Sequence, residues 1–193
     1  MVEVRRARPE DIPRVARTLA RAFDDDPLFQ RLVPTDRVPR LEKFYAATLR
    51  VVYLPLGEAW VTDDGLAAAL WAPPGRWHVP LWKQVRMLQV VPLFGTRALL
   101  GQRMHAAVER VHPSDPHYYL AILGVDPEAQ GRGYGASVLR PIFDRCRAEQ
   151  VDAYLESSNA KNHAFYRKQG FEIVTRLELP GGLPAWPMRR GHW

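Results

Sequence analysis

The sequence predicts an α/β (α+β) fold, and three observations lead to that prediction. Residues 118–125 form an apolar run, which a turn with alternating glycines separates from an amphipathic segment. This order is typical of a strand, a loop and a helix. Two further strand-like runs flank Asp63-Asp64-Gly65, which is a strong signal for a β-hairpin. Between residues 12 and 23, apolar residues recur at helical spacing.

The N-terminal part is expected to begin with an edge strand over residues 2–7, which alternate in polarity. The helix that follows ends at the acidic turn Asp24-Asp25-Asp26-Pro27, because the residue before a proline disfavours helical backbone. That turn is either a solvated loop or the acidic lip of a binding site. A second helix is expected over about Val38 to Val52.

From the hairpin onward, helices and strands are expected to alternate, with prolines and glycines between them. The apolar strand before the glycine turn suits burial on both faces. Pro187 inside the last strand implies an edge position or a bulge there. The expected elements are helices over residues 79–112 broken near Pro92 and Gly95, a strand over His117–Val125, a helix over about Gly133–Gln150, a strand over Ala153–Ser157, a short helix over Asn162–Gln169, and strands over Phe171–Leu179 and Ala185–Arg190.

Several aromatic and histidine residues have two interpretations each. The group of Phe29, Tyr45 and Tyr53 and the group of Trp71, Trp77 and Trp82 either pack in the core or line a pocket for a bulky ligand. His105 and His112 are seven residues apart on one helical face. No third ligand is spaced to join them, so no metal site is predicted.

Composition indicates an ordinary globular protein. The 193 residues are enough for one domain with a sizeable core, and the apolar share of 47% and charged share of 25% are typical. No apolar run is long enough to span a bilayer and no signal peptide is visible, so a cytoplasmic protein without a membrane partner is expected. The net charge of +6 comes from scattered arginines, so no nucleic-acid partner is expected. A single cysteine, Cys146, excludes an intrachain disulfide and is expected to be a packed thiol.

The glycine turn at residues 130–136 is predicted to bind a phosphate. The first turn of a helix has N–H groups without intrahelical partners, and its dipole favours an anion. The turn lacks the Gly-Lys-Ser/Thr of a Walker loop. A dinucleotide fingerprint fits Gly131, Gly133 and Ala136, with Glu156 twenty residues on, but it should begin directly after the strand. Here residues 126–130 intervene, so a coenzyme A pyrophosphate loop is the remaining class.

Two motifs carry a family resemblance. The segment Gln130-Gly131-Arg132-Gly133-Tyr134-Gly135 resembles the Gln/Arg-x-x-Gly-x-Gly/Ala motif of the GNAT N-acetyltransferases. About thirty residues on, the segment from Asn162 to Phe171 resembles that family's second signature, Asn-x-x-x-Tyr-x-x-x-Gly-Phe. Further pieces are similar to members of the family that acetylate the antibiotic puromycin. These pieces are Arg17–Phe23, Trp60–Gly65 and Leu155–Ser158.

The resemblance implies one GNAT domain over residues 1–193, with a single mixed, mostly antiparallel sheet of six to seven strands. The sheet splays between its fourth and fifth strands, and helices cover both faces. The implied cofactor is acetyl-CoA, whose pantetheine arm enters the splay. Asn162 would bind the pantetheine, cap its own helix, or do both. The implied cofactor-binding residues are Leu123, Val125, Gln130, Gly131, Arg132, Gly133, Tyr134, Gly135, Ala136 and Asn162.

The implied reaction is acyl transfer (EC 2.3.1) to a primary amine by direct attack in a ternary complex, with no metal. Tyr166 matches the family's general acid. Proton transfer from a phenol of pKa ~10 to a thiolate of pKa ~8.5 is uphill by about 2 kcal/mol. Either local positive potential offsets that cost, or Tyr166 only hydrogen-bonds the sulfur. Glu156 is the expected base, unless it pairs with an arginine; Asp26 and a backbone carbonyl are the rivals.

The expected acceptor is a small-molecule amine, either puromycin-like or another antibiotic or metabolite. The acceptor is expected to contact the loops at residues 24–31 and 71–82, and the acidic turn would attract a cationic amine. A protein lysine or N-terminal acetyltransferase and a non-catalytic coenzyme A sensor are the alternatives. The chain is expected to be a monomer or a homodimer.

Overall fold

The computed structural model describes residues 2–192, which contain one eight-stranded sheet. The strand order is β1-β2-β3-β4-β5-β8-β6, with β7 paired to β8 outside this path. Strands β4 and β5 are parallel and the other pairs are antiparallel, which confirms a mixed, mostly antiparallel sheet. The strands are β1 (Val4–Arg6), β2 (Ala59–Thr62), β3 (Ala67–Ala72), β4 (His117–Val125), β5 (Asp152–Ser157), β6 (Glu172–Ile173), β7 (Leu177–Leu179) and β8 (Leu183–Arg190).

The sheet has more strands than the predicted six to seven, because one segment that was predicted as a single strand contains two strands. The segment Phe171–Leu179 holds the short strands β6 and β7, which both pair with β8. Pro187 pairs regularly with Glu156 on the β5 side, but on the other side the register shifts by one residue between Ile173–Met188 and Leu177–Ala185, which agrees with the predicted bulge. The Pro187 carbonyl accepts from Val174, where β6 has already ended. The missing N–H therefore costs no ladder bond on that side.

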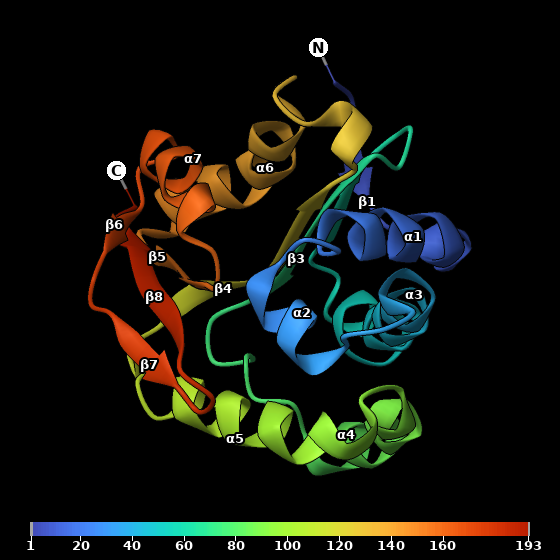
Figure 1. Ribbon diagram of the computed structural model, residues 1–193. Helices are drawn as coiled ribbons and strands as arrows, with labels where there is room; N and C mark the ends of the chain where they lie inside the picture. The colour runs from blue at the N-terminus through green and yellow to red at the C-terminus, as the bar shows by residue number, and fades with distance from the viewer. Residues whose placement is uncertain (1, 193) are drawn as a thin grey trace.

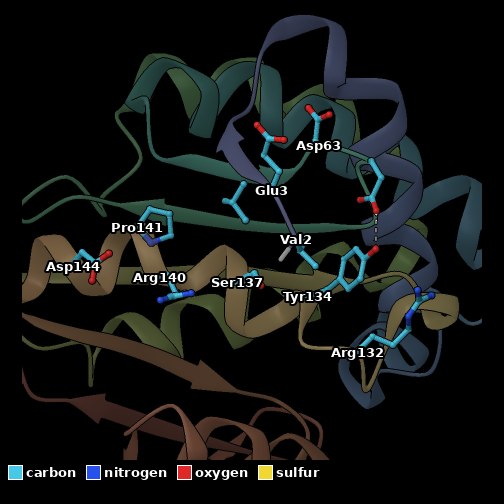
Figure 2. Close-up of a pocket in the computed structure, with 11 residues that line it drawn as sticks. Val2, Glu3, Asp63, Arg132, Tyr134, Ser137, Arg140, Pro141 and Asp144 are labelled. Atoms are coloured by element: carbon cyan, nitrogen blue, oxygen red, sulfur yellow. Dashed lines mark hydrogen bonds between the residues drawn. The ribbon is translucent and has the colours of Figure 1, made fainter.

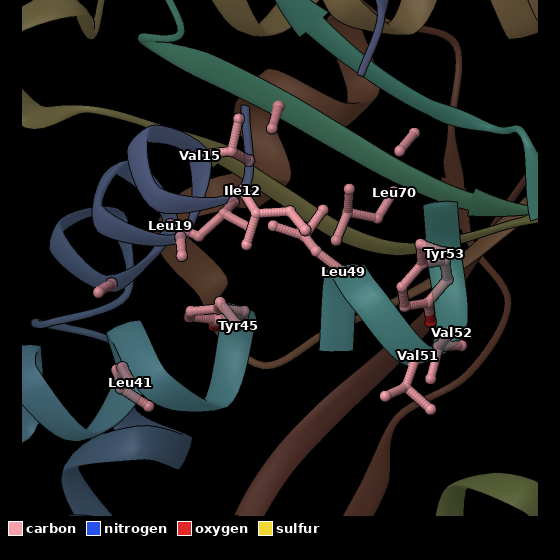
Figure 3. Packing of buried hydrophobic residues seen from close by; sticks show 14 of the residues in the cluster. Ile12, Val15, Leu19, Leu41, Tyr45, Leu49, Val51, Val52, Tyr53 and Leu70 are labelled. Carbon is pink, nitrogen blue, oxygen red and sulfur yellow. The ribbon is translucent and has the colours of Figure 1, made fainter. Parts of the chain in front are cut away.

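Helices cover both faces of the sheet (Figure 1). Helices α6 and α7 lie together on one face, and α1 and α3 lie on the other. The core is accordingly in two parts. Figure 3 shows the part beneath α1 and α3, where Leu19, Leu41 and Leu49 are fully buried. The helices are α1 (Ile12–Ala22), α2 (Pro27–Leu32), α3 (Arg37–Thr48), α4 (Leu81–Met87), α5 (Ala98–Glu109), α6 (Tyr134–Glu149) and α7 (His163–Lys168).

The predicted second helix has a different end, and a short helix precedes it. Helix α3 stops at Thr48, and a π-helical turn over Leu49–Tyr53 continues it. Helix α2 was not predicted. It begins at the acidic turn because the Asp26 carboxylate accepts from the Leu28 N–H at 2.9 Å, and Pro27 suits the first helical position.

Strands β4 and β5 pair only where they begin. Residues His117–Tyr119 lie opposite Asp152–Tyr154. Beyond Tyr119, β4 continues to Val125 paired with β3 but without a partner on the β5 side. In the β3–β4 register Leu70 lies opposite Ile122 and Trp71 opposite Leu120, so a bulge leaves residue 121 without a partner. A bulge bends its strand and increases the twist. The predicted splay between the fourth and fifth strands is confirmed.

The alternation of the strand decides which backbone groups of β4 face the splay. The Asp126 N–H donates to the Leu66 carbonyl at 2.8 Å, on the β3 side. Successive residues of a strand direct their N–H and C=O groups to opposite sides. The backbone groups of Val125 and Leu123 therefore face away from β3, toward the splay. Within residues 2–192 no helix is long and apolar enough to cross a membrane.

Candidate active site

The glycine turn lies in the open between β4 and α6. Gly131 and Gly133 are exposed and have φ angles of +73° and +85°. A Cβ at either position would meet no atom within 4 Å, so the left-handed backbone and not crowding requires glycine there. The Ser137 N–H donates to the Gly133 carbonyl at 3.0 Å, and the N–H groups before it in the first turn have no intrahelical acceptor. The turn is thus accessible to an anion.

The side chains around the turn are partly engaged elsewhere. Gln130 Nε2 donates to the Val125 carbonyl at 3.2 Å, which ties the turn to the end of β4. The Tyr134 hydroxyl donates to Asp64 in the β2–β3 hairpin at 2.8 Å. The Arg132 guanidinium is exposed and lies 5.8 Å from the Tyr134 ring. Because the Gln130 and Tyr134 side chains are already hydrogen-bonded, only the Arg132 side chain remains to contact a phosphate. Gln130 and Tyr134 could contact it through their backbone groups.

Gly135 brings the start of α6 against α7. A Cβ at Gly135 would lie 3.2 Å from the Phe165 ring and 3.4 Å from Val125. The next residue, Ala136, is half-buried in the same turn. Only a glycine allows this approach without displacing a neighbour. The two predicted cofactor motifs therefore meet in space, one at the start of α6 and the other on α7.

Asn162 begins the second motif, and Tyr166 lies in its middle. Tyr166 is buried on α7 against Phe165 and Phe171. Burial, together with the nearby charge of Asp26, raises the pKa of the Tyr166 phenol above its ordinary value. Asn162 is exposed and makes no cap bond, so the capping prediction was wrong. The Asn159 side chain caps this segment instead, because it already accepts from the Lys161 N–H at 3.0 Å.

In the acidic turn Asp25 is exposed and Asp24 is half-exposed, whereas Asp26 is buried. Asp26 is 4% exposed, and the Ser158 hydroxyl donates to its Oδ2 at 2.7 Å. Burial raises the Asp26 pKa, while the Ser158 and Leu28 bonds oppose that rise. Asp24 pairs with Arg37 at 2.9 Å. The turn thus joins the end of β5, within electrostatic range of Tyr166.

Glu156 is paired with one histidine, His112, and no ion pair between Glu156 and an arginine is found among residues 2–192. Its carboxylate lies 3.2 Å from His112 Nδ1, and both side chains are nearly inaccessible, at 7% and 1% exposure. His112 Nε2 lies 2.9 Å from His117 Nε2, and His117 Nδ1 lies 2.7 Å from the Asp115 carbonyl. His112 follows α5 and is not on the helix with His105. This chain of contacts was not predicted, because no local sequence pattern links His112 to Glu156 across 44 positions.

Aromatic rings surround the Glu156–His112 pair. The Trp77 ring stacks on His112 at 3.7 Å between centroids, and Tyr119 and Tyr154 stand edge-on to His112 at 4.7 and 5.0 Å. Burial, and then the charge of Glu156, raises the pKa of Tyr119 and Tyr154. The same causes raise the pKa of Tyr53. Glu156 lies two residues beyond the last β4–β5 pair, at the start of the splay.

The three tryptophans that were expected either to pack in the core or to line a ligand pocket lie in three different environments. Trp71 is fully buried in the core against Phe143. Trp77 covers His112 as described, and Trp82 is 56% exposed on α4. Tyr45 and Phe29 pack in an aromatic cluster beneath α1. Of the residues with two interpretations, Trp77 stacks on the histidine partner of Glu156, and Tyr53 lies within range of the Glu156 charge.

A surface groove lies on the other side of α6 (Figure 2). Ser137, Arg140 and Asp144 of α6 line it, opposite Glu3 and Asp63. Arg132 and Tyr134 of the glycine turn also line it, so the groove reaches the predicted phosphate-binding turn. Cys146 is buried, which raises its thiol pKa to about 12 and leaves no reactive thiolate at neutral pH. No metal-binding group of three or more His, Cys, Asp or Glu is found among residues 2–192.

Comparisons with known proteins agree with this geometry. The model of the acetyltransferase (GNAT) family matches residues 96–171. An uncharacterized N-acetyltransferase of Schizosaccharomyces pombe is 27% identical over 188 residues, which cover 91% of this chain and 76% of that protein. The N-alpha-acetyltransferase RimI of Mycobacterium tuberculosis is 34% identical over 90 residues, covering 45% of this chain and 57% of RimI.

The fold itself has close counterparts. A crystal structure from Corynebacterium glutamicum, described as histone acetyltransferase HPA2 and related acetyltransferase, superposes with a TM-score of 0.76. That comparison covers 99% of this chain and 97% of the other, at 24% identity. The matched segment holds both predicted motifs, and the whole chain has the mixed, splayed sheet. These findings support the GNAT acetyltransferase family for this chain, which is accordingly an acyltransferase.

Proposed function

We propose that residues 1–193 act as one acetyltransferase domain that moves an acetyl group from acetyl-CoA to the primary amine of a small molecule. The observation that supports this most is spatial. An open glycine turn follows β4, and the Glu156 carboxylate lies where β4 and β5 part. The buried Tyr166 lies within electrostatic range of Asp26, which is hydrogen-bonded to Ser158 at the end of β5. When bound, acetyl-CoA would supply an already activated acetyl thioester.

The residues present fit this cofactor. The first-turn N–H groups of α6 and the Arg132 guanidinium suit a pyrophosphate. The pantetheine arm resembles a short peptide and can bind an unpaired strand. The backbone of Leu123 and the N–H of Val125 remain for it, since Gln130 already uses the Val125 carbonyl. Asn162 is exposed beside this path and would hydrogen-bond the arm.

Tyr166 is assigned to the thiol leaving group. Its environment supplies no positive potential to strengthen it as an acid; burial and Asp26 raise its pKa instead. Full proton transfer to a thiolate is then more costly than the ~2 kcal/mol expected from ordinary values. We therefore assign Tyr166 a hydrogen bond to the developing thiolate, which stabilises the charge without needing a completed transfer.

Glu156 is assigned as the base that removes a proton from the substrate ammonium. It stands at the start of the splay and is held by His112 and not by an arginine. The rival, Asp26, already uses one oxygen for the Leu28 N–H and the other for Ser158. Glu156 is therefore better placed to accept a proton than Asp26.

The enclosed, aromatic surroundings of Glu156 favour a small amine over a peptide. Tyr53 and Tyr119 lie near the Glu156 carboxylate, and aromatic rings beside a carboxylate suit a cationic amine. The resemblance to puromycin N-acetyltransferases makes puromycin the first acceptor to test. The similarity to RimI keeps a protein N-terminus as the second candidate.

The test is an acceptor screen that measures thiol release from acetyl-CoA. Puromycin, aminoglycosides, polyamines and a basic peptide are offered in turn, and coenzyme A affinity is measured in parallel. Turnover of a small amine is expected. Preference for the peptide would move the assignment to a protein acetyltransferase. Tight coenzyme A binding without turnover of any amine would indicate a sensor.

A further inference from the structure

The hydrogen bonds around His112 limit how many protons the site can hold. A backbone carbonyl only accepts, so His117 Nδ1, at 2.7 Å from the Asp115 carbonyl, must carry a hydrogen. Between His117 Nε2 and His112 Nε2, at 2.9 Å, one nitrogen must donate. A third hydrogen must lie between His112 Nδ1 and the Glu156 carboxylate, at 3.2 Å, since two lone pairs would otherwise face each other.

These three hydrogens are one more than two neutral imidazoles and a carboxylate possess. Each neutral imidazole carries one N–H, which accounts for two. The third is an additional proton, and it makes the net charge of Glu156, His112 and His117 zero. With only two hydrogens, one of the three close contacts would join two acceptors in a buried site, which is costly.

The surroundings favour His112 as the carrier of the added proton. Burial lowers the His117 pKa, and the neighbouring His112 lowers it further, so His117 is the neutral member. The Trp77 ring covers His112 at 3.7 Å, and an indole face attracts a cation. Beyond Trp77, the ring of His78 stacks at 3.5 Å. Asp115 and Arg189 are the charged groups near His117, and Tyr53, Tyr119 and Tyr154 face Glu156.

We propose that His112 is a positioning residue, which as an imidazolium hydrogen-bonded to His117 keeps the buried Glu156 ionised and directed at the splay, where Glu156 can accept the amine proton. The proposal rests on the function proposed above. Without the imidazolium, the carboxylate would be enclosed by phenols and an indole with no opposite charge beside it, an environment that disfavours the ionised form. An already protonated Glu156 cannot act as a base.

The N–H bond of the substrate ammonium breaks, and its proton forms an O–H bond with Glu156 while His112 stays protonated. The free amine forms a C–N bond with the acetyl carbon, and the C–S bond then breaks with its electron pair on sulfur. The amine nitrogen loses its second proton, which ends on the thiol. Glu156 returns its proton to water, so each turnover releases one proton.

The direct test is the protonation of the two histidines in the intact protein, measured by ¹⁵N NMR of histidine-labelled chain at neutral pH. We expect both ring nitrogens of His112 to be protonated and His117 to be the neutral Nδ1–H tautomer. In Glu156→Gln, His112 should become neutral. A neutral His112 in the wild-type protein, in either tautomer, would overturn the proposal. This measurement needs no acceptor substrate.

The kinetic test uses the pH dependence of kcat/KM with an amine found by the acceptor screen. His112→Gln retains a donor to Glu156 but not the charge. The acid limb of its profile should move upward by about 1–3 pH units, the usual effect of losing an opposite charge at close range. Activity should return at high pH, which a merely structural defect would not produce. A uniform loss at all pH values would contradict the proposal.

The matched control is a histidine–glutamate pair on the surface. His105 on α5 lies 3.4 Å from Glu109 and is 70% exposed. His105→Gln should leave the pH profile unchanged. The two hypotheses fail in different ways. If no amine is turned over but His112 is an imidazolium, the proposed function is wrong and the additional proton on His112 is confirmed. If amines are acetylated and His112 is neutral, only the positioning role falls.

Discussion

The hydroxyl of Ser158 donates a hydrogen bond to Oδ2 of Asp26 at 2.7 Å, which fastens the α1–α2 turn to the end of β5. The two residues are 132 positions apart, and Asp26 also caps α2 through its other oxygen. One buried carboxylate therefore holds a helix start and the rim of the splay together. Changes at Asp26 should affect stability and the site geometry at once.

We expect Asp26→Ala to lower the free energy of unfolding by about 1–3 kcal/mol, from the lost cap and an unsatisfied Ser158 hydroxyl. Asp26→Asn keeps an acceptor for the Leu28 N–H and should cost much less. Chemical denaturation of both variants at neutral pH measures the difference. Equal losses in the two would mean that the charge of Asp26, and not its hydrogen bonds, stabilises the turn.

The pH dependence of Asp26→Asn has a definite sign. Burial raises the Asp26 pKa above its ordinary 3.8, so the folded protein binds this proton more tightly than the unfolded chain does. The stabilising contribution is fully present below pH 3.8 and is lost as the pH rises through the folded value. The free energy of unfolding of Asp26→Asn, relative to that of the wild-type protein, should therefore be higher at pH 7 than at pH 3. Denaturation curves at the two pH values provide the check, and the opposite order would contradict the raised pKa.

For Asp11 we expect the opposite dependence of stability on pH. Arg5 donates to both its oxygens, at 2.7 and 2.8 Å, and Arg8 N–H adds a third bond. The Arg5 hydrogen bonds, first of all, hold the Asp11 pKa below 3.8. This contribution is present above pH 3.8 and is lost as the pH falls through the folded value. Asp11→Asn should lower the denaturation midpoint at pH 7, and its difference from wild type should shrink toward pH 2. A constant difference would show that Asp11 is not ionised in these bonds.

Local patterns predicted the cofactor half closely. The strand His117–Val125 has the predicted bounds, since its apolar run, the following proline and the glycines all mark the same boundaries. The Asp-Gly hairpin also formed as expected, with Gly65 at φ +69°. In both cases the residues that decide the backbone conformation lie within the element itself.

Contacts between distant segments could not be predicted. Helix α2 has six residues, too few for a periodic pattern, and its cap depends on where the α1–α2 turn lands. The partnership of His112 with Glu156 joins a loop to a strand across the sheet, and neither residue has a local signature for it. For Pro187 the sequence predicted an edge or a bulge, but the neighbouring strand on which the irregularity lies depends on where β6 ends.

Tyr166→Phe tests how the leaving group is handled. Removing a hydrogen bond to a developing charge should lower kcat by about 10- to 150-fold while the KM for acetyl-CoA changes little. Since burial raises the Tyr166 pKa, no basic limb of the wild-type kcat profile should disappear in the variant. Steady-state kinetics between pH 6 and 10, at saturating cofactor, measure both quantities. A kcat within error of wild type would remove Tyr166 from the reaction.

Gly135→Ala tests the contact between the two cofactor motifs. The new methyl group would lie 3.2 Å from Phe165 on one side and 3.4 Å from Val125 on the other, so it cannot relax away from either. Overpacking of this kind costs about 1–3 kcal/mol, more than the ~0.5–1 kcal/mol that alanine gains over glycine in a helix. The variant should unfold at a lower denaturant concentration and bind coenzyme A more weakly, as calorimetry would measure.

Gly101→Ala in α5 is the matched control, because its methyl group would meet Leu32 at an ordinary 3.7 Å. That control should be stabilised by about 0.5–1 kcal/mol with unchanged coenzyme A affinity. If both variants gained stability and bound coenzyme A normally, the close approach of α6 to α7 would not be what shapes the cofactor site.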